Sequence, residues 1–128
     1  MSFPWVDYLK VAEALIRARN TFAPPEARYR AAISRAYYAA YCAARNHARD
    51  HEGYSPVPSG RDHGLVAEHY LTGGSRTHRK IGQTLQRLLL DRHRADYDDD
   101  VNQPLRPLAQ LAVQEAYQVF TLLQQLPS

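Results

Sequence analysis

Residues 30–41 decide the fold, and they read Arg-Ala-Ala-Ile-Ser-Arg-Ala-Tyr-Tyr-Ala-Ala-Tyr. Apolar side chains recur there at the three- and four-residue spacing of one helix face, for example at Ile33 and Tyr37. Pro25 suits the first turn of a helix, where its missing N–H has no partner to lose. The sequence therefore predicts a long helix over residues 25–50 with a buried face of alanine and tyrosine.

Proline and glycine divide the rest of the chain in the same way. Ser75 is a suitable N-cap for one of the resulting helices, and no segment has the strict alternation of a strand. We therefore expect a single domain over residues 1–128, an all-α antiparallel bundle of four long helices with one short helix lying across it. The expected helices are 5–22, 25–50, 63–71, 76–95 and 104–126.

Composition excludes several classes of protein. The chain has 128 residues, of which 45% are hydrophobic and 23% charged, as in an ordinary soluble domain. Cys42 is the one cysteine, which rules out an internal disulfide and a Cys-x-x-Cys metal site. A cytoplasmic location is expected from this cysteine usage. No apolar run approaches the roughly 18 residues of a membrane span.

Positive charge gathers in two segments. Residues 17–49 hold seven arginines and one acid, and residues 76–94 hold six basic residues and one acid. Arginine can bind phosphate through two parallel hydrogen bonds. These segments are therefore either an RNA-binding face or the solvated faces of helices in an arginine-rich chain.

Motif searches for a metal or a phosphate loop give nothing specific. The chain has neither a G-x-S-x-G nor a G-x-x-x-x-G-K-[ST] sequence. His47 and His51 are four residues apart but lack an obvious third ligand, so we interpret them as polar residues near a helix end. The acidic run 98–100 lacks the spacing of a calcium loop and is interpreted as a solvated turn. No metal and no cofactor are expected.

Three segments of the chain have the form of known family motifs. Ser34-Arg35-Ala36-Tyr37-Tyr38-Ala39 is similar to the S-R-x-Y-Y-A signature of the HEPN family. Residues 63–66, His-Gly-Leu-Val, resemble the short segment with a histidine that follows the first helix pair. Residues 92–97, Arg-His-Arg-Ala-Asp-Tyr, resemble the R-x-x-A-D-Y that ends the third long helix. The resemblance covers about residues 5–126 and is nearest to the small HEPN proteins encoded beside a minimal nucleotidyltransferase.

The resemblance implies a helical bundle that works as a homodimer. Many HEPN proteins are metal-independent ribonucleases with an R-x4-6-H motif, and some are toxins that a partner nucleotidyltransferase silences by attaching AMP to a tyrosine. The resemblance therefore implies a toxin-like RNA-binding protein, with endoribonuclease activity in a toxin–antitoxin or defence system. The alternative is a non-catalytic HEPN module that binds a nucleotidyltransferase partner or a nucleotide.

The sequence departs from the family at the motif histidine. Four to six residues after Arg92 come Tyr97, Asp98 and Asp99, none of which is a histidine. We expect Arg92 to contact phosphate, and Asp96 and Tyr97 to complete the site.

Other residues supply the remaining candidates. Arg35 and His63 are supporting members of the Arg92 site. The required spacing also occurs in Arg45 with His51 and in Arg87 with His93, which are alternative sites. The residues expected to contact RNA elsewhere are Arg45, Arg49, Arg87 and Arg94.

Some of these residues also have a structural interpretation. Arg35 and Asp96 are expected to form an interior ion pair between two helices, because a buried arginine needs a carboxylate partner. The ring of Tyr97 is expected to cover the core, with its hydroxyl in solvent. Arg92 is expected at the surface, close to the acidic turn.

Overall fold

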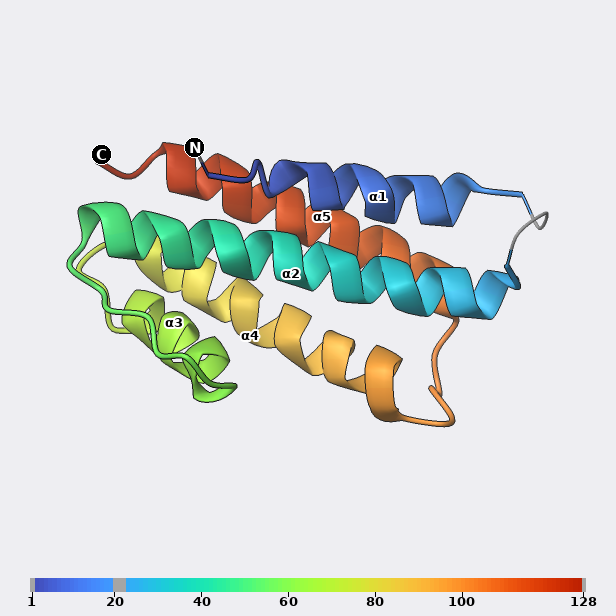
Figure 1. Cartoon of the computed structure of the whole chain (residues 1–128). Coiled ribbons are helices and arrows are strands. Elements are labelled where there is room, and N and C mark those ends of the chain that lie inside the picture. The colour runs from blue at the N-terminus through green and yellow to red at the C-terminus, as the bar shows by residue number, and fades with distance from the viewer. Residues whose placement is uncertain (1, 20–22, 128) are drawn as a thin grey trace.

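The bundle expected from the sequence is present in the computed structural model, which describes residues 2–19 and 23–127. These residues form five α-helices and no strand. Four long helices alternate in direction, and the start of α1 lies at the same end of the bundle as the end of α5 (Figure 1). The helices are α1 (Val6–Arg17), α2 (Pro25–His51), α3 (Arg61–Leu71), α4 (Arg76–Tyr97) and α5 (Leu105–Gln124).

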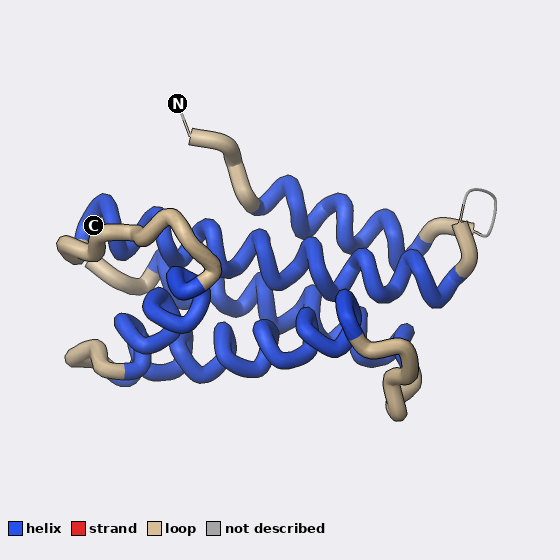
Figure 2. Tube along the Cα trace, turned by 60° about the horizontal axis from the view of Figure 1, so that its bottom comes forward, coloured by secondary structure: helices blue, strands red, loops and turns tan. Residues whose placement is uncertain are grey.

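Helix α2 is the centre of the bundle and packs against each of the other four helices. Figure 2 shows the described residues as helices joined by loops, with no strand among them. Its alanines are fully buried at Ala36, Ala40, Ala44 and Ala48, a four-residue repeat along one line of the helix. Side chains this small let neighbouring helices approach closely. The predicted apolar face of α2 is thereby confirmed, with Ile33 and Tyr37 also in the core.

Helix α1 is shorter than predicted. It ends at Arg17 rather than at residue 22, and Ala18 already has the extended ψ of 142°. The buried guanidinium of Arg28 donates hydrogen bonds to the carbonyls of Leu15, at 2.8 Å, and Ala23, at 3.1 Å. Arg28 thus satisfies one of the carbonyls that the end of α1 leaves free. Residues 20–22 lie outside the described residues.

The other boundaries coincide with the predicted ones or differ from them by at most two residues. Helix α4 continues to Tyr97, where the guanidinium of Arg30 donates to the carbonyls of Ala95, Asp98 and Asp99 at 3.1, 2.6 and 3.0 Å. This arginine on α2 therefore caps the end of α4. The expected N-cap is confirmed, because Ser75 Oγ accepts a hydrogen bond from the His78 N–H at 3.1 Å.

Helix α3 packs mainly against α4. A Cβ at Gly82 would lie 2.7 Å from the backbone N of Leu71, so only glycine permits this approach. The start of α3 is fixed by Asp62, which is 2% exposed and accepts hydrogen bonds from the hydroxyls of Tyr41 and Tyr54 and from the Val57 N–H. This network determines where His63 stands. In the part of the chain described, no helix is both long and apolar enough to cross a membrane.

Candidate functional site

One face of α2 contributes four side chains to the candidate site. Ser34, Tyr37, Tyr38 and Tyr41 are three or four residues apart or adjacent, so they project from the same side of the helix. Each side chain contacts a different residue of α3 or α4. The signature that suggested a family therefore corresponds to a contact surface between α2 and the two helices that follow it.

Arg92 lies against this face and not at the surface, contrary to the expectation from the sequence. Its side chain is only 12% exposed, and Nη2 donates a hydrogen bond to the Tyr38 hydroxyl at 2.6 Å. Nε is 3.0 Å from Oδ2 of Asp96, one helical turn later, in an ion pair too bent for a hydrogen bond. Ser34 Oγ donates to the same carboxylate oxygen at 3.2 Å. Arg92 is exposed too little to act as a freely moving surface cation.

The predicted ion pair between Arg35 and Asp96 is wrong. Asp96 pairs with Arg92, because a four-residue separation brings these two side chains together on α4. The guanidinium carbon of Arg35 instead lies 5.5 Å from the ring centroids of both Tyr8 and Tyr38. These cation–π contacts leave Arg35 half-buried on the surface of α2.

His63, in the first turn of α3, contacts the same face of α2 as Arg92 does. Its Nδ1 is 2.6 Å from the Tyr37 hydroxyl, and its ring lies 4.2 Å from that of Tyr41 and 5.8 Å from that of Tyr38. Burial lowers the pKa of His63, and the positive charge of Arg92 lowers it further, although Asp62 acts in the opposite direction. The imidazole is therefore neutral at pH 7.

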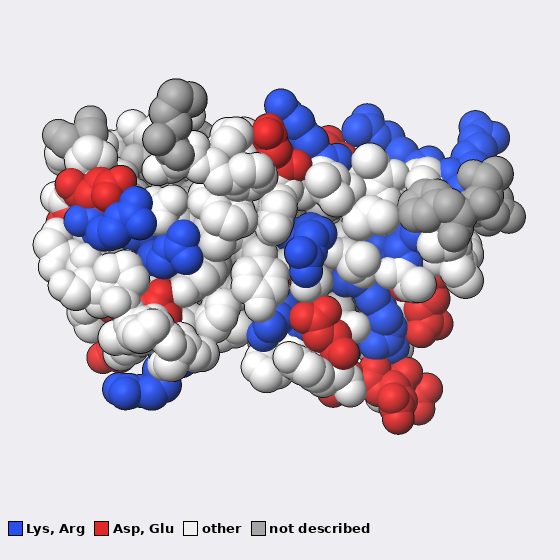
Figure 3. Space-filling model, in the orientation of Figure 1, with Lys and Arg blue, Asp and Glu red and all other residues white. Residues whose placement is uncertain are grey.

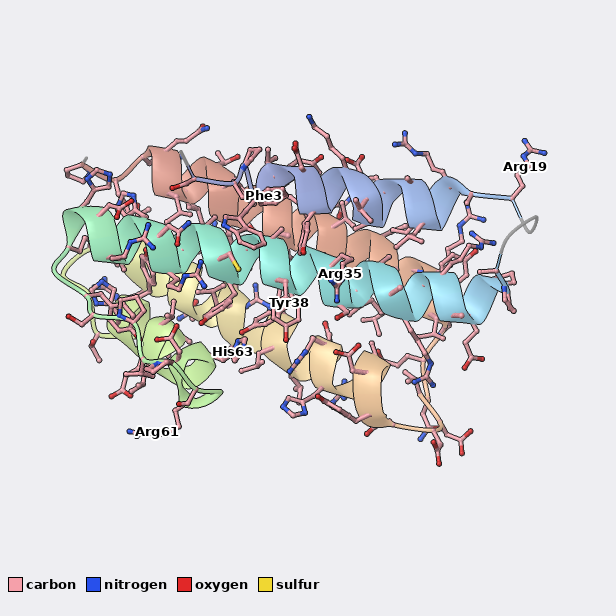
Figure 4. The ribbon with its side chains drawn as sticks, viewed as in Figure 1. Phe3, Arg19, Arg35, Tyr38, Arg61 and His63 are labelled. Carbon is pink, nitrogen blue, oxygen red and sulfur yellow. The ribbon has the colours of Figure 1, made fainter. Side chains whose placement is uncertain are left out.

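The arrangement has the elements of an acid–base site for an anionic substrate. When the neutral imidazole carries its proton on Nδ1, it donates to the Tyr37 oxygen and leaves the lone pair of Nε2 available to accept a proton. Because Tyr38 accepts from Arg92, its own O–H remains free to donate. Figure 4 shows Arg35, Tyr38 and His63 along the same side of the molecule.

Tyr97 is at the edge of the site and does not cover the core, so that expectation is also wrong. Its side chain is among the most exposed large ones, at 66%. The ring centroid is 5.7 Å from the guanidinium of Arg92 and 5.4 Å from the ring of His93. The last turn of α4 carries Tyr97 outward, because Arg92 and Asp96 occupy the face toward α2.

The two alternative arginine–histidine pairs are not brought together. In each pair the residues are six positions apart on a continuous helix, which separates them by roughly 120° around its axis. Arg45 lies against the ring of Tyr41 at 5.6 Å, whereas His51 is exposed near His47. Arg87 pairs with Glu115 at 2.9 Å, and His93 contacts Tyr97.

The four arginines expected to contact RNA all have local partners. Arg49 pairs with Asp50 at 2.8 Å, Arg94 with Asp91 at 3.8 Å, and Arg87 and Arg45 are placed as described above. Acidic side chains are interspersed with basic ones over the face seen in Figure 3, and the acidic turn projects at one end. That face therefore has no continuous basic patch.

No group of three or more metal-ligating side chains is arranged to hold a metal ion within residues 2–19 and 23–127. His47 does lie near two other histidines, His69 and His78, but all three surround the carboxylate of Glu52. Glu52 lies 2.8 Å from Nε2 of His69, 2.7 Å from Nε2 of His78 and 3.7 Å from Nε2 of His47. This cluster ties the ends of α2 and α3 to the start of α4.

Sequence reasoning missed three members of the site: Ser34, Tyr37 and Tyr38. The sequence predicts only a buried face of alanine and tyrosine on this helix, which is accurate for Tyr37, at 1% exposed. The available signal was their spacing. Hydroxyls repeated on one turn of an otherwise alanine-rich helix need partners, and those partners are His63, Arg92 and Asp96.

Comparison with known proteins adds no relative. A scan against protein-family models, a search of curated proteins and a search of solved structures each gave no match to this chain.

Proposed function

We propose that the chain is a HEPN-type, toxin-like RNA-binding protein and that the site between α2, α3 and α4 cleaves RNA without a metal. One observation carries this proposal. Arg92 and His63, from different helices, both contact Tyr38, with Arg92 hydrogen-bonded to its hydroxyl and the His63 ring 5.8 Å from its ring. A neutral imidazole that accepts a proton and a cation that stabilises the phosphate charge both promote cleavage by an RNA 2′-hydroxyl. His63 thus supplies the histidine that the R-x4-6-H spacing lacks.

The chemistry follows from these groups. In the tautomer that carries its proton on Nδ1, Nε2 of His63 takes the proton of the 2′-hydroxyl. The 2′-oxygen forms a bond to phosphorus, and the bond from phosphorus to the 5′-oxygen breaks. That oxygen takes a proton from solvent. Arg92 and the Tyr38 hydroxyl stabilise the charge on the phosphate oxygens. The products end in a 2′,3′-cyclic phosphate and a 5′-hydroxyl.

The proposal includes a homodimer in which two such sites face each other, as the family resemblance implies. The 66% exposure of Tyr97 supports this, because it leaves that edge of the site accessible to a second copy. Light scattering at micromolar concentration tests the dimer. A monomer mass throughout would remove this part of the proposal and leave cleavage to be judged separately.

Incubation of the purified protein with total tRNA and a chelator tests the cleavage. We expect fragments with cyclic phosphate ends in the presence of the chelator. Activity that appears only with added metal would contradict the mechanism, and intact tRNA under all conditions would contradict the enzyme.

A non-catalytic module is the second candidate, and the exposure of Tyr97 favours it. Among the described residues the Tyr97 hydroxyl has no hydrogen-bond partner, and its side chain is 66% exposed. A nucleotidyltransferase partner would find this hydroxyl accessible for attachment of AMP. Mass spectrometry after co-expression with a minimal nucleotidyltransferase would detect the added mass, and Tyr97→Phe would abolish it.

A further inference from the structure

A continuous line of aromatic rings and guanidinium groups leads across the molecule to the candidate site. We call it the aromatic–arginine track, and it consists of Phe3, Trp5, Tyr8, Arg35, Tyr38 and Arg92. The three rings near the start of α1 contact one another edge to face, with centroids 4.8 to 5.6 Å apart. Tyr8 then contacts Arg35 at 5.5 Å, Arg35 contacts Tyr38 at 5.5 Å, and Tyr38 contacts Arg92 at 5.1 Å.

The track is open to solvent. Phe3, at its far end, is 47% exposed. Trp5, Tyr8, Arg35 and Tyr38 are half-buried, so each presents part of its surface outward. Figure 4 shows Phe3, Arg35 and Tyr38 on the same side of the bundle, and Figure 3 gives the same side in space-filling form.

The chemistry of the track alternates between two kinds of group. Aromatic faces stack on nucleic-acid bases, and arginine both stacks on bases and binds phosphate. Arg35 has no acidic partner in the described part of the chain, so its charge is available to a ligand. A purely hydrophobic partner surface would leave this charge without compensation.

We infer that the aromatic–arginine track binds single-stranded RNA by stacking unpaired bases on Phe3, Trp5, Tyr8 and Arg35, and delivers the strand to Arg92 and His63. The inference rests on the proposed function and adds the form of the substrate. Paired bases are covered on both faces by their neighbours in the helix, so a duplex cannot use the rings. The stacking surfaces therefore select unpaired segments such as loops and ends.

Trp5 makes the inference directly measurable, because it is the only tryptophan in the chain. The probe is a single-stranded DNA 12-mer of adenine and cytosine, which lacks the attacking 2′-hydroxyl and is not cleaved. We expect titration with this strand to quench the fluorescence of Trp5, and the matching duplex to leave it unchanged. Equal quenching by the duplex would overturn the selectivity for unpaired bases.

Substitutions then separate stacking from general charge. Phe3→Ala and Arg35→Leu should each weaken binding of the single strand by roughly tenfold. The matched controls are Leu111→Ala, an equally exposed apolar residue on α5, and Arg61→Ala, an exposed arginine on α3. These two variants should bind like the wild type. Circular dichroism verifies that all four variants remain helical.

Other outcomes distinguish the track from the proposed function. If the wild type cleaves RNA while Phe3→Ala and Arg35→Leu bind and cleave normally, the track is overturned and the cleavage site stands. If Phe3→Ala converts a dimer to a monomer with no change in affinity for the single strand, the track is an interface between two copies. If no strand binds and no RNA is cleaved, both proposals are overturned.

Discussion

Nδ1 of His63 lies 2.6 Å from the hydroxyl of Tyr37, a contact that joins the first turn of α3 to the centre of α2. Tyr37 is buried in the core, so its hydroxyl holds the imidazole of His63 in a fixed position. Burial raises the pKa of the Tyr37 hydroxyl, which therefore keeps its proton throughout the physiological range. The orientation of the histidine is thus set by the fold and not by a flexible loop.

Arg92→Ala should lower the free energy of unfolding by about 1.5–3 kcal/mol, because the guanidinium is mostly buried and donates to Tyr38 beside Asp96. Urea denaturation measures this change. Arg106→Ala removes an exposed arginine and should change stability by less than about 0.5 kcal/mol. Equal midpoints for the two variants would show that Arg92 is not held as described.

Asp62→Asn should destabilise the protein by about 2 kcal/mol at pH 7, because this buried carboxylate accepts three hydrogen bonds. Thermal melting measures the loss, and Asp100→Asn, in the exposed turn, is the control. A melting temperature for Asp62→Asn that equals that of the control would contradict the network.

The carboxylate of Asp62 should also make the stability of the protein depend on pH in the acidic range. Burial opposes ionisation of Asp62, but the hydrogen bonds from Tyr41, Tyr54 and Val57 outweigh it and lower the pKa. A lowered pKa means that the stabilisation is complete above the unfolded-state value, about pH 4, and is lost as the pH falls through the folded-state value. Melting temperatures between pH 5 and pH 2 should therefore fall less steeply for Asp62→Asn than for the wild type. Parallel curves would contradict this assignment.

Two glycines should respond to alanine in opposite directions. A Cβ at Gly82 would clash with the backbone of Leu71, whereas a Cβ at Gly64, within α3, would meet nothing within 4 Å. Gly82→Ala should cost about 1–3 kcal/mol by forcing α3 from α4. Gly64→Ala should stabilise the helix by up to about 1 kcal/mol. Chemical denaturation of both variants checks the packing of α3, and the same sign for both would contradict it.

The sequence predicted the helices well because proline, glycine and the spacing of apolar residues are local signals. The end of α1 was placed wrongly because its cap, Arg28, comes from the next helix. The end of α4 was extended by Arg30, which lies more than sixty residues earlier in the chain. Such caps depend on the tertiary structure, which periodicity does not encode.

The candidate site was predicted in part. Arg92, Asp96 and His63 were named, but the partners of Arg92 and Arg35 were not anticipated. Side chains four residues apart on a helix are neighbours, so the pairing of Arg92 with Asp96 on α4 could have been predicted from the sequence. The meeting of His63 with Tyr37 depends on how Asp62 fixes the start of α3, and that arrangement is visible only in the folded chain.

In the proposed function, His63 is the base of the RNA-cleaving site and Arg92 is the cation beside it. The most direct measurement is the single-turnover rate of cleavage of a single-stranded RNA by the wild type, His63→Ala and His51→Ala in a chelator. We expect His63→Ala to lose roughly a hundredfold or more in rate while its helix content is unchanged, and His51→Ala to match the wild type. Wild-type cleavage that persists in His63→Ala, or that is lost in His51→Ala, would contradict the claim.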